Sequence, residues 1–213
     1  MIIAIDGPAA AGKGTLARRL ARHLGLAYLD TGLLYRAVGL AVTRAGGNPD
    51  DPADAAAAAQ RLTPDGLSDP ALRDDEVGQL ASRVAVLPAV RAALLEFQRG
   101  FVRSPPGGAA GAVLDGRDIG TVVCPTADVK LFITGSLEVR AARRAKELRE
   151  RGVDAIEERV LEEMRERDAR DSRRAAAPLV PAGDARIIDT SDMDADTAFA
   201  AALAFVQDGA ARA

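Results

Sequence analysis

The segment Gly7–Thr15, with the sequence GPAAAGKGT, holds the residues whose types and spacing are most typical of phosphate chemistry. Its glycines allow successive backbone N–H groups to converge on an anion, and Lys13 supplies a flexible positive charge. An apolar run at residues 2–5 precedes the segment, and apolar residues recur at helical spacing after it. A strand, a glycine-rich turn and a helix in this order predict a phosphate-binding loop, whereas glycines that only relieve steric conflict are the alternative.

The loop departs from the general pattern at one position. A Ser or Thr normally follows the lysine directly, but here Gly14 intervenes and the hydroxyl belongs to Thr15. This variant resembles the loop of nucleoside monophosphate kinases. We therefore expect ATP to contact the whole segment, that is Gly7, Pro8, Ala9, Ala10, Ala11, Gly12, Lys13, Gly14 and Thr15.

Two further polar clusters follow predicted strands. The first, after residues 26–29, consists of Asp30, Thr31, Gly32, Tyr35 and Arg36; the second, after residues 112–114, consists of Asp115, Gly116, Arg117 and Asp118. Each could be no more than a helix cap or a solvated surface. Ligands of open parallel sheets bind at the carboxyl ends of the strands, so the placement of both clusters beside a phosphate loop favours a binding role.

Arginines form the next signal, because only three of the 28 basic residues are lysines. Arg140, Arg143 and Arg144 share one helix face. The segment 167–174 (RDARDSRR) runs into residues 175–181, where a helix must end before a proline, and this favours an anion clamp. The alternative is a solvent-exposed helix face that carries ion pairs. We expect this alternative for Arg149, Arg151, Arg159 and Arg165.

The elements that position these residues form an alternating pattern. Apolar runs predict strands at 26–29, 112–115, 128–133 and 186–189 in addition to 2–5, and helical periodicity predicts helices at 16–24, 32–41, 55–62, 88–102, 137–151, 154–170 and 194–206. Residues 67–80 are weakly patterned and predict mostly loop with short helix. Strands that alternate with helices predict an α/β fold with a five-stranded parallel sheet and helices on both faces.

Composition narrows the class of protein. The 213 residues suit one α/β domain, and the net charge of −3 gives no reason to expect a nucleic-acid partner. Cys124 is the only cysteine and His23 the only histidine, which excludes an internal disulfide and the usual His/Cys metal clusters. No stretch approaches the ~20 apolar residues of a membrane span, and the chain enters its first strand at once. We expect a cytoplasmic protein that does not bind membranes.

Four motifs together resemble bacterial cytidylate kinases, and the resemblance covers nearly the whole chain. They are the loop at 7–15, LDTG-x-x-YR at 29–36, GRDIGTVV at 116–123 and RD-x-x-DS-x-R at 167–174 followed by Pro178 and Leu179. The resemblance implies ATP-dependent phosphorylation of CMP and dCMP by a monomer with a P-loop kinase fold and a helical lid. It also implies a core at 1–36, 109–136 and 183–213, a monophosphate-binding region at 37–108 and a lid at 137–182.

Site roles follow from the resemblance. CMP would be bound at its base by Ser82, Arg91 and Asp118, at its phosphate by Arg36, Arg117 and Arg174 with Thr31 nearby, and at its sugar by Arg167 and Asp171. Lys13 would hold the donor phosphates, Mg²⁺ would be held by Thr15 and Asp115 partly through water, and Arg140 and Arg144 would act from the lid. The acceptor phosphate is already an anionic nucleophile, so we expect no general base.

The chain departs from the family at residues 61–80. Many members carry a small antiparallel sheet inserted here, but the alternating strands of that insert are not visible in this sequence. We therefore expect a reduced monophosphate-binding insert. A smaller insert is expected to close less tightly over the base and so to discriminate less strongly against UMP.

Two other functions remain open from the residues alone. A related kinase with another acceptor, such as adenylate or shikimate kinase, would share the loop and Arg36. Asp118 favours cytosine, because a carboxylate accepts from an amino group and repels the O4 acceptor of uracil. A non-catalytic nucleotide-binding module is the alternative from another class, and Lys13, Arg117 and Arg174 speak against it, since a pure binder need not neutralise charge at the point of transfer.

Overall fold

The computed structural model describes residues 1–210, which divide into two compact units. Unit 1 comprises Met1–Leu29 and Pro105–Ala213, and unit 2 comprises Asp30–Ser104. The last three residues of the expected core at 183–213 lie outside the described part of the chain. Unit 1 contains both the sheet and the helices of the expected lid, and the lid as a separate region stays a prediction.

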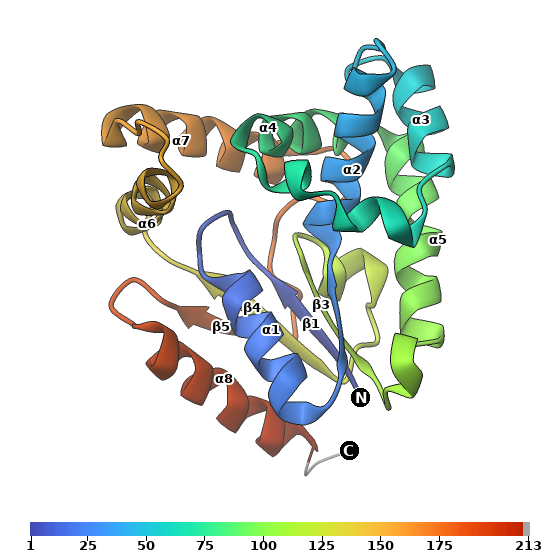
Figure 1. The fold of residues 1–213 in the computed structure, drawn as a ribbon. Coiled ribbons are helices and arrows are strands. Elements are labelled where there is room, and N and C mark those ends of the chain that lie inside the picture. Colours follow the sequence, from blue (N-terminus) through green and yellow to red (C-terminus); the bar gives the residue numbers. More distant parts are fainter. Residues whose placement is uncertain (211–213) are drawn as a thin grey trace. The chain divides into compact units, whose positions relative to one another are not determined.

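Unit 1 is built on the predicted five-stranded parallel sheet, with the strand order β2-β3-β1-β4-β5 (Figure 1). The strands are β1 (Ile2–Asp6), β2 (Ala27–Asp30), β3 (Ala112–Gly116), β4 (Val129–Thr134) and β5 (Arg186–Asp189). β1 pairs in parallel with both β3 and β4. The chain that follows β1 therefore leaves the sheet at the centre of its carboxyl edge. Ligands of open parallel sheets bind at this edge.

Two helices cover one face of this sheet, α1 (Lys13–Leu24) and α8 (Ala195–Ala210), which lie side by side in Figure 1. Ile3, Ile5 and Leu131 point toward them and pack with Leu20 and Val206 in a fully buried cluster. Because successive residues of a strand point to opposite faces, the side chains of residues 4, 6 and 130 face the other way. Within unit 1 that face meets η4 (Ile119–Val123), a π-helical turn that the sequence did not predict.

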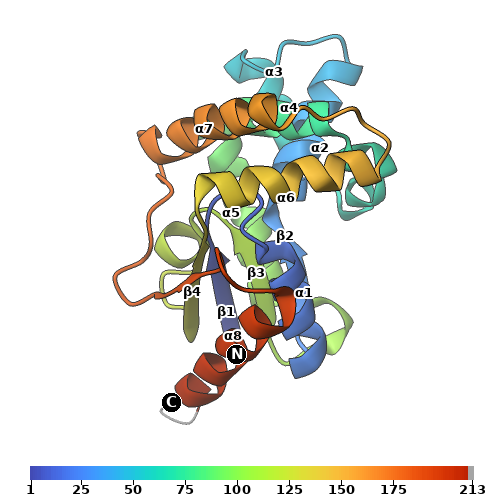
Figure 2. The same ribbon diagram turned by 90° about the vertical axis from the view of Figure 1, so that its left-hand side faces the viewer.

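The helices α6 (Leu137–Glu150) and α7 (Glu157–Arg173) run alongside each other, as Figure 2 shows. Ala141 and Ala145 of α6 pack against Val160 and Met164 of α7, and the small alanines allow close approach of the two helices. The predicted range 154–170 was displaced by about one turn, since α7 continues to Arg173. The whole arginine-rich motif up to that residue is therefore helical. The short turn η3 (Pro106–Gly108) precedes β3 in the chain.

After Asp30, the last residue of β2, the regular secondary structure of unit 2 is all helical. It contains α2 (Thr31–Arg44), α3 (Pro52–Gln60), η1 (Pro64–Ser68), η2 (Pro70–Arg73), α4 (Asp75–Val84) and α5 (Pro88–Arg103). Leu34, Val38, Val84 and Leu94 form its buried centre. None of residues 31–104, all of which the structure describes, lies in a strand, which confirms the reduced insert.

The expectation of mostly loop at 67–80 was wrong for its second half, because α4 is a regular helix of 10 residues. Val77, Ala81 and Val84 recur at i, i+4 and i+7 and are buried on one side of it. The helix was missed because only three apolar residues mark its inner face and Gly78 interrupts them.

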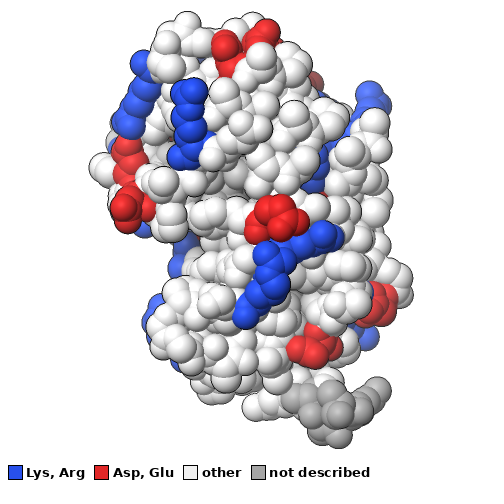
Figure 3. All heavy atoms as spheres, turned by 90° about the vertical axis from the view of Figure 1, so that its right-hand side faces the viewer, with Lys and Arg blue, Asp and Glu red and all other residues white. Residues whose placement is uncertain are grey.

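The described helices include none with the length and apolar character needed to cross a membrane. On the face of the molecule drawn in Figure 3, acidic and basic side chains are interspersed rather than gathered by sign.

Candidate active site

The loop after β1 has a backbone that only glycine can adopt at its first position. Gly7 has a φ of 144°, and a Cβ atom there would lie 1.9 Å from the carbonyl oxygen of Ile133 in β4. Gly12 (φ 86°) is in the left-handed region and directly precedes α1. The turn from strand to helix is thus tight, and it brings backbone amides to the start of a helix.

Lys13 is the first residue of α1, and its side chain is buried (6% exposed). Its Nζ donates a hydrogen bond to the carbonyl oxygen of Pro8 at 2.8 Å. The ammonium group therefore lies over its own loop rather than in solvent. A buried cation at a helix N-terminus is suited to binding negatively charged phosphates.

The glycine inserted between Lys13 and Thr15 has a packing reason. A Cβ atom on Gly14 would lie 3.3 Å from Oδ2 of Asp115, a close contact. The same Oδ2 accepts a hydrogen bond from the hydroxyl of Tyr28 at 2.8 Å. Gly14 thus leaves room for the Asp115 carboxylate beside the loop, and Tyr28 fixes its orientation. Sequence reasoning missed Tyr28, whose only signal was an aromatic residue with a polar tip in a predicted strand.

The residues near the loop fit Mg²⁺ held mainly by substrate. Asp115 offers a carboxylate and Thr15 an exposed hydroxyl, both hard oxygen ligands. In the described part of the chain no group of three or more His, Cys, Asp or Glu residues could hold a metal. Such a sparse donor set suits Mg²⁺, which is commonly bound by one or two carboxylates, waters and the phosphates of a nucleotide.

Two arginines, one from the motif at 116–123 and one from the motif at 167–174, meet at one buried carboxylate. Arg117 Nε donates to Asp171 Oδ2 at 3.1 Å, and Arg174 donates to the other oxygen, Oδ1. Asp171 is 1% exposed, and the side chain of Arg174 is 6% exposed. Arg117 also donates to the carbonyl oxygen of Gly116 at 3.1 Å. The carboxylate therefore holds both guanidinium groups in fixed orientations.

The electrostatics of this cluster favour the ionised form of Asp171. Burial by itself raises the pKa of Asp171, but the positive charges of Arg117, Arg174 and Arg167 outweigh it. The pKa therefore lies below its ordinary value. Three arginines around one carboxylate leave a net positive charge, which suits an anionic ligand.

Arg140 and Arg144, both expected to act from the lid, have different surroundings. Arg140 is 5% exposed and donates to Asp168 Oδ2 at 2.7 Å, to the carbonyl oxygen of Gly135 at 2.8 Å and to that of Ala9 at 3.3 Å. It therefore connects α6 both to α7 and to the phosphate loop. Arg144 instead pairs with Glu147 of its own helix at 2.7 Å.

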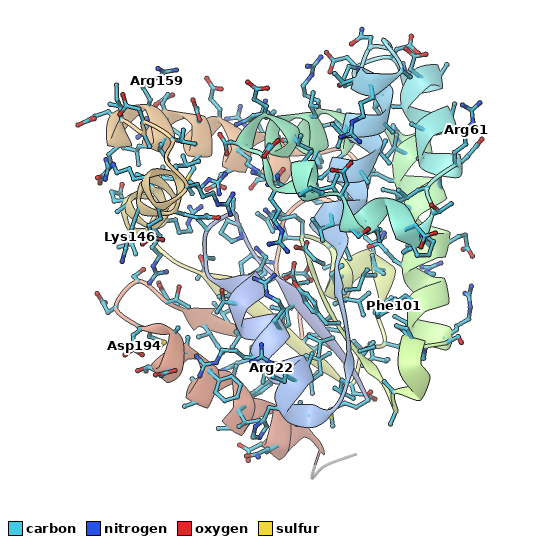
Figure 4. The ribbon with its side chains drawn as sticks, in the orientation of Figure 1. Arg22, Arg61, Phe101, Lys146, Arg159 and Asp194 are labelled. Atoms are coloured by element: carbon cyan, nitrogen blue, oxygen red, sulfur yellow. The ribbon has the colours of Figure 1, made fainter. Side chains whose placement is uncertain are left out.

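A cavity of about 250 Å³ opens beside the loop, between the start of α1 and the start of α8. Its lining includes Gly12, Thr15, Met193, Asp194 (labelled in Figure 4) and Ala198. The lining is mostly apolar, and such a pocket next to a phosphate site suits a flat aromatic base.

Arg143, which also lines the cavity, donates to the carbonyl oxygens of Thr190 (2.6 Å) and Met193 (3.1 Å). Sequence reasoning placed Arg143 on a helix face with Arg140 and Arg144 but did not assign it to a site. Its role in joining α6 to the turn before α8 depends on the fold, because its partners lie about 50 residues away.

Asp118 lies at the junction of β3 and η4 and is 5% exposed. Its carbonyl oxygen accepts hydrogen bonds from the backbone N–H groups of Val122 and Val123 at 2.9 and 3.1 Å. These bonds close the π-helical turn and set the direction in which the Asp118 side chain leaves the backbone.

In unit 2, Arg36 is held across the start of α4. Its Nη1 donates to the carbonyl oxygens of Leu72 and Asp74, both at 2.9 Å. A Cβ atom on Gly78 would lie 2.8 Å from the guanidinium, so this helical glycine makes room for it. Thr31, the first residue of α2, is buried in the same unit.

Ser82 and Arg91, assigned by resemblance alone, lie on either side of the turn between α4 and α5. Ser82 is 3% exposed, and its hydroxyl has no hydrogen-bond partner in the structure. Arg91 donates to the carbonyl oxygen of Ala85 at 3.3 Å, and its guanidinium lies 5.7 Å from the ring centroid of Tyr35. A buried hydroxyl without a partner is costly, which is the kind of feature that a ligand resolves.

The four arginines expected to be solvated are all exposed. Arg159 is exposed and points away from the helix pair (Figure 4). Arg151 and Arg165 form ion pairs with glutamates three or four residues before them, Glu147 and Glu162 respectively. Arg149 is exposed as well, and its Nε and Nη2 both donate to the carbonyl oxygen of Ala155, which fixes the connection between α6 and α7.

Comparisons with known proteins give the same family over almost the whole chain. A family model described as cytidylate kinase matches residues 3–208. A cytidylate kinase of Paramagnetospirillum magneticum is 66% identical over 205 residues, which are 96% of this chain and 97% of that protein. One from Rhodospirillum rubrum is 62% identical over 203 residues, or 95% of each. A crystal structure of an uncharacterized protein from Eubacterium ventriosum has a TM-score of 0.56 at 17% identity, covers 97% of this chain and 98% of that one, and supports the fold alone.

Proposed function

The chain belongs to the cytidylate kinase family, and we propose that it transfers a phosphoryl group from ATP to both CMP and dCMP with Mg²⁺ as cofactor. Phosphorylation of CMP is the activity of this family, so the chain is a phosphotransferase. One observation carries the assignment of the site. The structure has a buried Lys13 in a phosphate loop and, in the same unit, the cluster of Arg117, Asp171 and Arg174.

The donor is proposed to bind along the loop. The amides of residues 7–15 and the ammonium of Lys13 would hold its β- and γ-phosphates. The cavity beside Gly12 and Thr15 would take its adenine ring, with Met193 and Ala198 against the apolar face. Mg²⁺ would neutralise charge on the donor oxygens, with Thr15 and Asp115 as its protein ligands, in part through water.

The acceptor phosphate is proposed to bind to arginines. As the resemblance implies, its oxygens would be contacted by Arg36, Arg117, Arg174 and Thr31. One of these oxygens attacks the γ-phosphorus, and the bond to the oxygen bridging the β- and γ-phosphorus atoms breaks, which releases ADP and the diphosphate product. No group needs to remove a proton, because the nucleophile is an anion. The arginines act by fixing its position and by stabilising the charge of the transition state.

The remaining proposed contacts set specificity and closure. Asp118 and Ser82 would accept from the cytosine amino group, and Arg91 would donate to the ring acceptors. Arg167 and Asp171 are assigned to the sugar. Asp171 would thereby contribute to two functions, since it also orients Arg117.

The lid residues are proposed to differ in role. Arg140 donates to the carbonyl oxygen of Ala9 in the loop. It would thereby hold α6 in a fixed position relative to the donor phosphates. Arg144 would reach the transferring phosphoryl group after leaving Glu147.

We further propose that the protein is a monomer. We also propose that it acts in the cytoplasm, where its nucleotide substrates are found, and that its reaction belongs to pyrimidine nucleotide metabolism. Its ligands would be small molecules rather than nucleic acid or a membrane. Light scattering coupled to size-exclusion chromatography tests the monomer, and a mass of two or more chains would contradict it.

A coupled assay of ADP release with CMP, dCMP, UMP, AMP and shikimate tests the function. We expect turnover with CMP and dCMP that EDTA abolishes and Mg²⁺ restores. Absence of turnover with both cytidine nucleotides, or faster turnover with AMP, would refute the proposal. Nucleotide binding without turnover of any acceptor would indicate a non-catalytic module instead.

A further inference from the structure

A buried carboxylate that the proposed reaction does not use lies between the loop and the acceptor residues of unit 1. Asp6 is the last residue of β1 and is 4% exposed. Its Oδ1 accepts a hydrogen bond from the backbone N–H of Ile119 at 2.8 Å, and its Oδ2 accepts one from Gly120 at 2.7 Å. One carboxylate thus satisfies the first two N–H groups of η4, which have no partner within the turn itself.

Gly120 packs between this carboxylate and a lysine side chain. A Cβ atom on Gly120 would lie in ordinary contact with Oδ2 of Asp6, at 3.4 Å, and in a tight contact with Cδ of Lys130, at 3.2 Å. Lys130 itself is directed elsewhere, because its Nζ donates to Asp184 and to the carbonyl oxygen of Pro125. The backbone of residues 118–120 is therefore held from one side by Asp6 and from the other by the bonds that close η4.

The charges that act on Asp6 come from the donor and the acceptor sides. Burial raises the pKa of Asp6 to about 6, the N–H groups of Gly120 and Ile119 oppose this rise, Asp118 adds to it and Lys13 opposes it. Asp6 thus interacts electrostatically both with the lysine of the loop and with the carboxylate proposed to read cytosine.

We propose that Asp6 is a positioning residue for acceptor recognition: its two hydrogen bonds fix residues 118–120 and thereby orient the carboxylate of Asp118 toward the base of CMP. The inference rests on the proposed role of Asp118. Asp6 does not touch the substrate, and it acts only through the backbone that carries Asp118.

Asp6→Asn tests the inference with almost no change of volume. The amide keeps one acceptor oxygen, but its NH₂ group faces a backbone N–H and cannot accept from it. We expect the KM for CMP to rise by roughly tenfold, as for the loss of a charge-assisted hydrogen bond, while the KM for ATP changes by less than about twofold. In an Asp118→Ala background the same substitution is expected to cause no further rise, because the residue it positions is gone.

A second variant reaches the same hydrogen bond from its other end. Gly120→Ala adds a methyl group 3.2 Å from Cδ of Lys130 and 3.4 Å from Oδ2 of Asp6, and we expect the resulting adjustment at residue 120 to give the same selective rise in the KM for CMP. Val206→Ala, in the core between α8 and the sheet, is the matched control. It lowers the melting temperature without contact to either site and is expected to leave both KM values unchanged.

The outcomes separate the inference from its premise. If Asp118→Ala leaves the KM for CMP unchanged, the proposed role of Asp118 fails. If Asp118→Ala raises it but Asp6→Asn and Gly120→Ala do not, or if Asp6→Asn and Asp118→Ala combine additively, the positioning role of Asp6 is wrong.

Discussion

Arg117 and Asp171 are 54 residues apart in the chain, yet the Nε of the arginine donates to Oδ2 of the aspartate at 3.1 Å. The other oxygen of Asp171 accepts from Arg174. Two arginines proposed to bind the acceptor phosphate are thus oriented by one buried carboxylate. An arginine held in this way loses little side-chain entropy when the phosphate arrives.

Asp171→Asn should lower kcat/KM for CMP by roughly ten- to a hundredfold, because the amide accepts from one arginine at most and both lose a charged partner. Initial rates at varied CMP check this. Asp196→Asn, which breaks the exposed ion pair with Arg19, is the matched control and should leave kcat/KM unchanged. An equal loss in both variants would show that the orientation of the arginines is unimportant.

Asp6 should make stability depend on pH in a direction unusual for a carboxylate. Its pKa is raised from 3.8 to about 6 by burial, so between these values the folded chain binds more protons than the unfolded chain. The contribution of Asp6 to stability is full below the lower value and is lost as the pH rises through the higher one. Relative to Asp6→Asn, the wild type should lose about 2 kcal/mol of unfolding free energy from about pH 4.5 to about pH 7.5.

Urea unfolding of the wild type and of Asp6→Asn across this range measures the difference, and the other carboxylates cancel because both chains contain them. A difference that stays constant with pH would mean that Asp6 titrates alike in the folded and unfolded chains.

Ser82→Ala should separate binding from folding. The buried hydroxyl of Ser82 has no partner, so its removal should leave the free energy of unfolding unchanged or raise it by about 1 kcal/mol. The same change should raise the KM for CMP by roughly three- to tenfold if the hydroxyl binds the base. Ser68→Ala, which removes an exposed hydroxyl bonded to the carbonyl oxygen of Asp65, should leave that KM unchanged. A fall in stability without a change of KM would make Ser82 purely structural.

Ala195→Trp should block the cavity beside the loop and so act on the donor. Ala195 lines this cavity and is exposed, so an indole ring can be accommodated without disturbing the core. We expect the KM for ATP to rise by about tenfold or more, with little change in the KM for CMP. Ala200→Trp, at another exposed position of α8 that does not line the cavity, is the matched control. Equal effects at both positions would move the adenine site elsewhere.

The sequence by itself determined those features that short-range chemistry specifies. The loop at 7–15 was recognisable because its glycines stand between a buried strand and an amphipathic helix. All five strands were found within one or two residues, since parallel strands are continuous apolar runs. The missed helix α4 has a short apolar face interrupted by Gly78, and the π-helical turn at Ile119–Val123 depends on the carboxylate of Asp6 rather than on a local pattern.

Only the tertiary structure decided which side chains act as pairs. The hydroxyl of Tyr28 orients Asp115, Asp6 holds the backbone beside Asp118, and Asp171 holds Arg117. Each pair joins residues 54 to 114 positions apart. Periodicity describes which face of an element is buried, but a contact across such a separation depends on the order of strands in the sheet and on how closely their ends pack.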